Sequence, residues 1–156
     1  MKAITLWPEW AWAICHLGKN VENRSWVIPP GLYTLHAGMR FDGRGIKPEH
    51  REDAILSVRG TAHYQNLTRE QTDALDQMKD TLIPVGHVVG LIRVTGHTNY
   101  LRQEQWNRSM GWAAPGQIAN HIELVHAMRH PVPCKGALGL WTVPADIQHT
   151  LDEMTG

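Results

Sequence analysis

The segment of residues 86–96, GHVVGLIRVTG, constrains the fold more than any other part of the chain. Valine and isoleucine are frequent in it, and β-branched residues of this kind are typical of strands. Helical patterns are set among further, shorter segments of strand-like composition, at residues 2–6, 22–26, 32–37, 118–125 and 137–143. The strands do not alternate regularly with helices, as they do in a parallel α/β fold. The sequence therefore predicts an α+β domain around a small β-barrel.

Helix signals divide the chain further. Trp7-Pro8-Glu9-Trp10 predicts a helix start, since proline suits a first turn and glutamate complements the helix dipole, and Gly18 predicts its end. Residues 41–84 are more charged and carry two helical patterns, near residues 48–58 and from Thr68. Thr68-Arg69-Glu70-Gln71 forms a capping box. We interpret residues 41–84 as a helical insertion in one domain of 156 residues.

Length and composition describe an ordinary globular chain. A chain of 156 residues can bury a core without disulfides or metals. No apolar run approaches the roughly 20 residues that span a bilayer, and the first residues lack the apolar region of a signal peptide. Cys15 and Cys134 lie far apart with no CxxC pair, so we expect reduced thiols in a cytoplasmic protein.

The charges balance, with 15 Lys and Arg against 15 Asp and Glu. Proteins that bind long nucleic acids through their phosphates usually carry a clear basic excess. The neutral balance therefore argues against tight non-specific binding of nucleic acid and leaves room for a small pocket or a local basic patch.

Polar and aromatic groups gather in residues 18–26, GKNVENRSW. In an extended chain Glu22, Arg24 and Trp26 share one face, and Lys19 comes just before them. The indole would stack on a flat ligand, the guanidinium would supply a fork of donors, and Lys19 with Glu22 would form a proton-exchanging pair. The alternative is an ion-pair ladder on an edge strand, and spacing alone leaves both open.

Two opposing effects act on the pKa of Lys19 in such a pair. Burial lowers the pKa, whereas the neighbouring Glu22 raises it by favouring the ammonium form. We expect Glu22 to prevail and Lys19 to stay charged, which suits holding an anion better than taking a proton.

Histidines and cysteines offer further candidates. A strand histidine such as His36 is more often structural than functional, although its proton chemistry near neutral pH suits a role in cleaving an RNA backbone. The spacing of His126, His130 and Cys134 suggests a metal site, but two prolines interrupt the segment and structural zinc normally takes paired ligands. We therefore expect no metal site and no cofactor. The common nucleotide-fold and hydrolase motifs are absent from the sequence.

Several pieces of the chain, taken in order, resemble the ASCH family, a branch of the PUA-like superfamily. They are AITLWPEW at residues 3–10, GKNVENRSW at 18–26, LHA at 35–37, and PCKG at 133–136 running into GLW at 139–141. The GxKxxExR pattern in the second piece is the most specific. The match covers nearly the whole chain except residues 41–84.

The resemblance implies a PUA-like pseudobarrel of about five or six strands with flanking helices. It also implies a cleft beside the GxKxxExR segment that takes RNA or a modified nucleobase. Some small members of the family hydrolyse N4-acetylcytidine with a lysine, a threonine and a glutamate, and others have been described as ribonucleases. Lys19 matches that lysine, whereas Glu22 stands at the threonine position, so the hydroxyl is missing there.

The sequence therefore predicts an RNA- or nucleobase-binding ASCH domain that recognises RNA, single-stranded nucleic acid or a modified nucleoside. Base stacking on an indole is worth about 1–3 kcal/mol and suits a chain without bulk positive charge. The alternatives are a hydrolase that uses the same cleft, acting on N4-acetylcytidine or on RNA, and a module that binds a peptide. The expected ligand-binding residues are Trp7, Arg24, Trp26 and Arg40, and the catalytic candidates are Lys19, Glu22 and His36.

Overall fold

The structure is a computed structural model that describes residues 1–40, 58, 67–77, 84–100, 102, 104, 107 and 111–155. The elements within these ranges are, in order, β1 (Lys2–Leu6), α1 (Pro8–His16), β2 (Val21–Arg24), β3 (Gly31–Ala37), α3 (Arg69–Gln77), β4 (His87–Asn99), β5 (Ile118–Pro133), β6 (Leu140–Thr142) and α4 (Ala145–Thr155). The helix predicted near residues 48–58 lies outside the described residues, Val58 apart. None of the described helices is long and apolar enough to cross a membrane.

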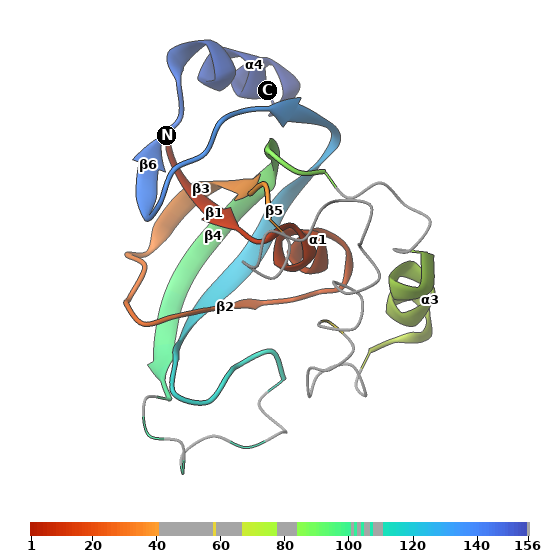
Figure 1. The fold of residues 1–156 in the computed structure, drawn as a ribbon, viewed down its shortest axis with the longest axis vertical. Helices are drawn as coiled ribbons and strands as arrows, with labels where there is room; N and C mark the ends of the chain where they lie inside the picture. The colour runs from red at the N-terminus through yellow and green to blue at the C-terminus, as the bar shows by residue number, and fades with distance from the viewer. Residues whose placement is uncertain are drawn as a thin grey trace.

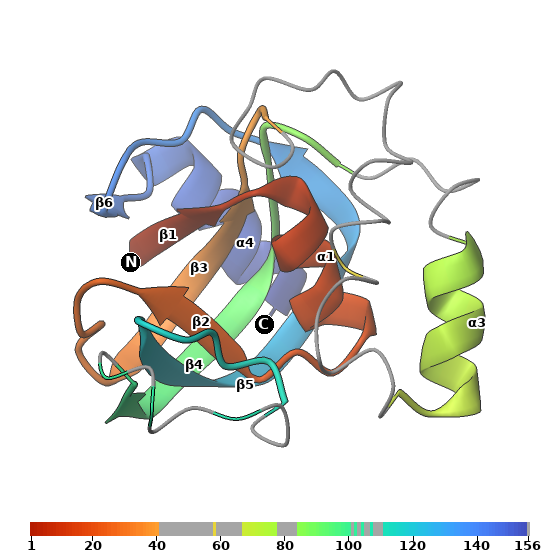
Figure 2. The same ribbon diagram turned by 60° about the horizontal axis from the view of Figure 1, so that its bottom comes forward.

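The strands form one curled sheet of six strands in the order β2-β5-β4-β3-β1-β6. β1 and β3 run parallel, and the other neighbouring pairs are antiparallel. The curl makes a half-barrel around α1, while α3 lies to the side of α1, away from the sheet (Figures 1 and 2). The predicted α+β class is thus confirmed, with a barrel-like sheet at its centre.

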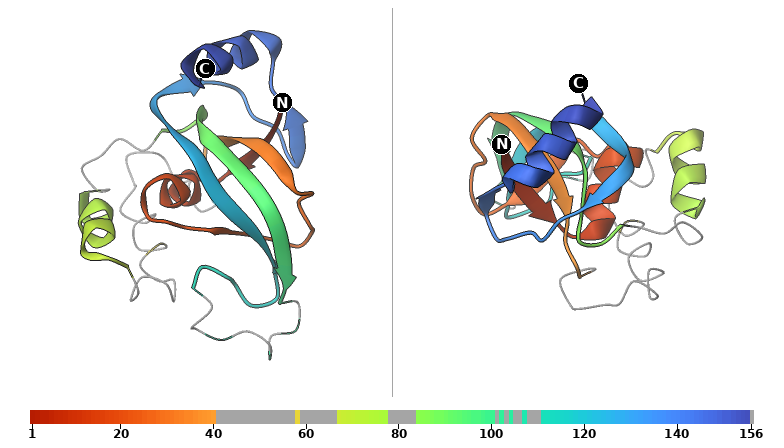
Figure 3. Two further views of the ribbon diagram at one scale, coloured as in Figure 1. Left: turned by 180° about the vertical axis from the view of Figure 1, so that it is seen from behind. Right: turned by 90° about the horizontal axis from the view of Figure 1, so that it is seen from above.

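Both faces of the sheet are covered by apolar side chains. On one face Ile4 and Leu35 pack with Ile14 of α1. On the other, Ala3 packs with Val143 and with Leu151 of α4. Because side chains alternate along a strand, neighbouring residues of β1 enter opposite clusters. Figure 3 shows α4 lying across the end of the molecule where the two termini meet.

The ends of two helices follow the predicted chemistry. Gly18 has a φ of +69°, a left-handed conformation that favours glycine, directly after α1. The backbone N–H groups of Leu17 and Lys19 both donate to the carbonyl of Ala13, at 2.9 and 3.2 Å, and close the last turn. The capping box of α3 is also confirmed, since the Gln71 N–H donates to the Thr68 hydroxyl at 3.1 Å and the Gln71 side chain accepts from the Thr68 N–H at 3.0 Å.

Part of the predicted insertion packs against α1. Leu75 of α3 and Val58 are fully buried in a second cluster with Trp12 of α1 and with Leu17, which directly follows that helix. α1 therefore lies between two apolar clusters, one shared with the sheet and one shared with the described part of the insertion.

Several strands differ in length from the prediction: β4 extends to Asn99, β6 covers only Leu140–Thr142, and β2 and β5 differ as follows. β2 is an edge strand and ends at Arg24, two residues before the predicted end at Trp26. β5 continues to Pro133 and pairs with β4 along its length, beyond the predicted end at residue 125. β2 pairs with β5 only over Ile118–His121. The prolines later in β5 lie beyond this stretch, where β2 no longer pairs with the strand. Proline has no N–H to donate, and it is tolerated where a strand has no partner on one side.

Candidate functional site

Lys19, Glu22 and Arg24 form one network between the end of α1 and the edge strand β2. The Lys19 ammonium lies 3.3 Å from Glu22 Oε2, and Arg24 Nε donates to Glu22 Oε1 at 2.9 Å. Both carboxylate oxygens are therefore held by cations. The structure brings together the three polar residues that the spacing in residues 18–26 singled out.

The network is largely removed from solvent. The side chain of Lys19 is 4% exposed and that of Glu22 is 9% exposed, while that of Arg24 is 26% exposed. Lys19 also donates to the carbonyl of Val21, and its ammonium lies over the ring of Trp10, 5.7 Å from the centroid. An exposed ion-pair ladder, the alternative interpretation of this segment, does not fit such burial.

Burial lowers the pKa of Lys19 from its usual value, and this effect outweighs the opposing attraction and hydrogen bond of Glu22. Arg24 adds to the lowering as a second nearby cation. The order that the sequence suggested for these two effects on the pKa is therefore reversed, whereas the expected positive charge of Lys19 near neutral pH stays a prediction. The reversal has a physical reason, because spacing shows the carboxylate partner but not the Trp10 ring over the ammonium or the depth of burial.

Asn120, a fully buried residue of β5, holds the segment that carries Arg24 and Trp26. Its Oδ1 accepts from the Ile28 N–H at 2.8 Å, and its Nδ2 lies 3.2 Å from the Glu22 carbonyl and 3.3 Å from the Trp26 carbonyl. One amide thus supports the end of β2 and the turn beyond it. The Asn120 side chain therefore tethers residues 26–28 to β5 after the chain has left the sheet at Arg24.

Asn23, on β2, holds the loop that precedes β5. Its Nδ2 donates to the Trp112 carbonyl and its Oδ1 accepts from the Ala114 N–H, both at 2.9 Å. The Trp112 ring meets Trp10 edge-on, with centroids 6.5 Å apart. The loop therefore carries an aromatic side chain to the ring that covers Lys19.

Thr5 connects this network to a second one. Arg24 Nη2 donates to the Thr5 carbonyl at 2.9 Å. The Thr5 hydroxyl lies 3.1 Å from His36 Nδ1 and accepts from the indole N–H of Trp141 at 3.0 Å. His36 Nε2 lies 2.7 Å from the carbonyl of Cys134.

These contacts fix the tautomer of the neutral His36 ring. A carbonyl oxygen only accepts, so Nε2 carries the proton and donates to Cys134, and Nδ1 accepts from the Thr5 hydroxyl. Burial lowers the pKa of His36, which favours this neutral form, although the Cys134 carbonyl partly opposes the shift. The ring also meets Trp141 edge-on, with centroids 5.4 Å apart.

His36 is therefore not grouped directly with Lys19 and Glu22. Within the described residues, Thr5 connects His36 to their network. The Thr5 hydroxyl binds His36, and the Thr5 carbonyl accepts from Arg24. The sequence-based grouping of His36 with the two other catalytic candidates gains no direct contact from the structure. Alternation along β1 and β3 gives the physical reason, because it directs the side chains of Thr5 and His36 toward the C-terminal segment.

The expected ligand-binding residues occupy different places. Trp7 is 44% exposed at the start of α1, two residues beyond the Thr5 carbonyl that binds Arg24. Trp26 is half-buried and packs against the main core cluster. Arg40 is exposed, and none of the hydrogen bonds or ion pairs of the described residues joins it to the network.

Thr5, Asn120 and Trp141 are among the residues of these networks that the sequence did not predict as site residues. Their partners lie 31 to 136 residues away along the chain, except for the nearer pairing of Thr5 with Arg24. The only local signal was that Thr5 and Trp141 fall inside the segments that carry the ASCH resemblance.

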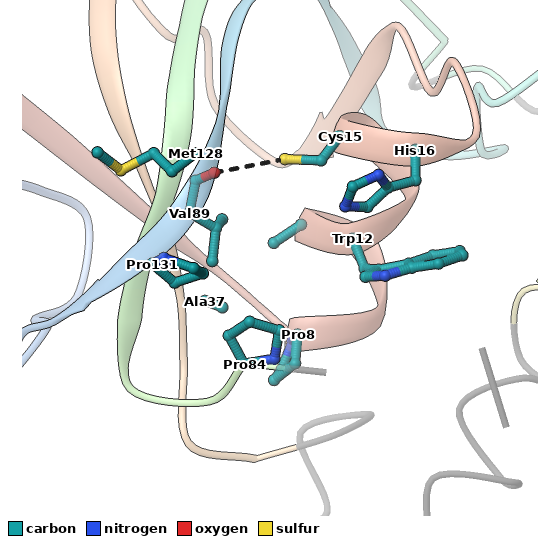
Figure 4. Close-up of a pocket in the computed structure, with 10 residues that line it drawn as sticks. Pro8, Trp12, Cys15, His16, Ala37, Pro84, Val89, Met128 and Pro131 are labelled. Atoms are coloured by element: carbon teal, nitrogen blue, oxygen red, sulfur yellow. Dashed lines mark hydrogen bonds between the residues drawn. The ribbon is translucent and has the colours of Figure 1, made fainter. Parts of the chain in front are cut away.

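A separate small cavity of about 40 Å³ lies between α1 and the ends of β4 and β5. Figure 4 shows the Cys15 thiol on its wall, donating to the carbonyl of Val89 at 3.8 Å. Burial raises the pKa of this thiol to about 12, so it stays protonated and is a poor nucleophile. Most of the lining is apolar, from residues such as Trp12 and Met128.

A scan against protein-family models gives no match to this chain, and a search of curated proteins gives none either. The resemblance to the ASCH family accordingly stays a prediction from the residues that carry it.

Proposed function

We propose that the chain is an ASCH domain of PUA-like architecture that binds RNA or a modified nucleobase beside residues 18–26, in the cytoplasm. The single observation that carries the proposal is the buried Lys19–Glu22–Arg24 network, in which two cationic side chains share one carboxylate. With Lys19 protonated, the network holds one positive charge in excess, although the whole chain is neutral. A local excess of this kind favours an electron-rich or anionic ligand.

Aromatic surface accompanies the charge. Trp26 follows Arg24 by two residues, and Trp7 is an exposed indole on the turn that the Thr5–Arg24 hydrogen bond holds. Indoles next to a guanidinium suit a base attached to a phosphate, because the base stacks while the guanidinium takes oxygens. The curled sheet supports the proposed PUA-like architecture, and the free thiols of Cys15 and Cys134 suit the proposed compartment.

The experiment is calorimetric titration of the purified chain with cytidine, N4-acetylcytidine and short single-stranded RNA. Wild type should bind at least one of them. The variant Trp26→Leu should lose about 1–3 kcal/mol of binding free energy, which is the value of one base stacked on an aromatic ring. Met154→Ala, an exposed change on α4, is the matched control and should bind like wild type. Absence of binding to all three ligands would refute the proposal.

A second candidate function is hydrolysis of N4-acetylcytidine or RNA at the same site, and the lowered pKa of Lys19 favours it. A lysine whose amine loses its proton more readily can act as a general base. Incubation with N4-acetylcytidine, followed by chromatography of released cytidine, tests the amidohydrolase. Turnover that disappears in both Lys19→Ala and Glu22→Gln would establish catalysis in place of simple binding.

A further inference from the structure

The side chains of the network differ in how many hydrogen-bond donors they have left. The Lys19 ammonium has three N–H donors. It binds the Val21 carbonyl and Glu22 Oε2, and the Trp10 ring lies over it. With only 4% of its side chain exposed, Lys19 has little left to offer a ligand.

Glu22 is in the same position as an acceptor. Each of its carboxylate oxygens already binds a cation, Oε1 to Arg24 and Oε2 to Lys19. Its side chain is 9% exposed. Glu22 therefore presents little accessible surface to a ligand, because it is almost buried between two cations.

Arg24 is different, because it is both the most exposed member and the one with spare donors. A guanidinium has five N–H donors. Nε binds Glu22 and one Nη2 proton binds the Thr5 carbonyl, so three donors have no partner among the described residues. These two bonds fix the plane of the guanidinium, since one comes from β2 itself and the other from β1.

We propose that Arg24 binds a phosphate group of single-stranded RNA, while Lys19 and Glu22 position Arg24 without touching the ligand. This inference rests on the proposed function and adds which part of the ligand the network contacts. A guanidinium fork matches the spacing of phosphate oxygens, and the anion offsets the excess positive charge. A neutral base edge would accept hydrogen bonds but leave that charge in place. The Arg24 contact is therefore independent of base identity.

The test measures affinity against salt for oligonucleotides of different sequence. Short single-stranded RNAs of uridine, adenosine or cytidine alone are titrated by fluorescence anisotropy at several KCl concentrations. The proteins are wild type, Arg24→Gln and the control Arg93→Gln, which removes an exposed arginine of β4. Thermal melting of each variant checks that it is folded.

Arg24→Gln should weaken binding of all three RNAs by a similar factor, about tenfold, which is the scale of a charge-assisted hydrogen bond. The slope of log K against log salt should become shallower by about 0.7, the value for one phosphate contact to a single strand. Arg93→Gln should change neither quantity. If Arg24→Gln is unfolded, Arg24→Lys replaces it, which should keep the salt slope but weaken all three RNAs alike through loss of the fork.

Other outcomes separate this inference from the function on which it rests. Loss of affinity for only one of the three RNAs would mean that Arg24 reads a base, and an unchanged slope in Arg24→Gln would mean that Arg24 contacts no phosphate. Either result would overturn the inference alone. Binding of nucleosides without any binding of RNA would do the same. If wild type binds no RNA and no nucleoside, both the proposed function and the inference fail.

Discussion

Gly136 lies so close to His36 that a Cβ at position 136 would stand 2.5 Å from Cε1 and 2.6 Å from Nδ1 of the imidazole. The same Cβ would stand 2.8 Å from the Thr5 hydroxyl. Such distances leave no room for a methyl group. The C-terminal segment therefore passes directly over the hydrogen bond between Thr5 and His36, and only glycine permits that approach.

Gly136→Ala should consequently lower the free energy of unfolding by about 1–3 kcal/mol, the usual cost of overpacking a closely packed site. Urea denaturation measures the change. Gly96→Ala is the matched control, because a Cβ there meets no atom within 4 Å. Equal stabilities for the two variants would show that the segment moves aside without cost.

His36 should titrate below its ordinary pKa of 6.5 and should carry its proton on Nε2 in the neutral form. Nuclear magnetic resonance of the ring nitrogens measures both properties. The sign of the stability effect follows from the lowered pKa. As pH falls below 6.5, the unfolded chain takes up the proton first, so the unfolding free energy decreases until the pH reaches the folded pKa.

The variant His36→Gln isolates this contribution, because the other histidines remain in place. The difference in unfolding free energy between wild type and His36→Gln should shrink on going from pH 7.5 to pH 5.5, about one unit on either side of the ordinary histidine pKa. A constant difference would indicate that the ring keeps an ordinary pKa in the folded protein.

Lys19→Ala should weaken ligand binding at least tenfold, about 1.4 kcal/mol. The variant removes one of the two cations that hold Glu22, and Glu22 in turn holds Arg24. It should also lower stability, because a buried carboxylate loses a partner. A double-mutant cycle with Glu22→Gln should give a coupling energy of about 0.5–3 kcal/mol. Unchanged affinity for RNA and nucleosides would remove Lys19 from any role at the site.

The lowered pKa of Lys19 gives a separate prediction above neutral pH. In the window between the folded pKa and the usual value of 10.5, the unfolded chain binds the proton that the folded chain has lost. Stability of wild type relative to Lys19→Met should therefore rise with pH through this window. A relative stability that falls as pH rises would mean that Glu22 outweighs burial after all.

Leu75→Ala in α3 should destabilise the chain by about 2–5 kcal/mol, since it empties a buried site shared with α1. Asp73→Ala changes an exposed residue of the same helix and should have an effect within about 0.5 kcal/mol. Thermal or urea unfolding compares them. A negligible effect of Leu75→Ala would show that α3 contributes little to the core.

Features governed by neighbouring residues could be predicted from the sequence. Strand β1, the glycine that ends α1 and the capping box of α3 depend on contacts within a few residues, so composition and spacing indicate them. The grouping of Lys19, Glu22 and Arg24 belongs to the same class, because all three lie within six residues of one another.

Features that depend on tertiary contacts could not be predicted in this way. The side chain of Asn120 holds Ile28 across 92 residues of sequence, and Trp141 donates to Thr5 across 136. The continuation of β5 through Pro131 depends on where β2 stops, which no local pattern reveals. The surroundings of Lys19 likewise include a distant loop, because the Trp10 ring over its ammonium contacts Trp112.

The pairing of β1 with β6 has a consequence for how the chain acquires its fold during synthesis. Lys2 pairs with Thr142, both along the backbone and through a 2.9 Å side-chain hydrogen bond, so one edge of the first strand is satisfied by residues that lie 140 positions later in the chain. Until residues 140–142 have emerged from the ribosome, that edge of β1 stays unpaired and is a template for association with other chains. A nascent chain stalled before residue 140 should accordingly depend on chaperones more than a chain in which β6 has paired with β1.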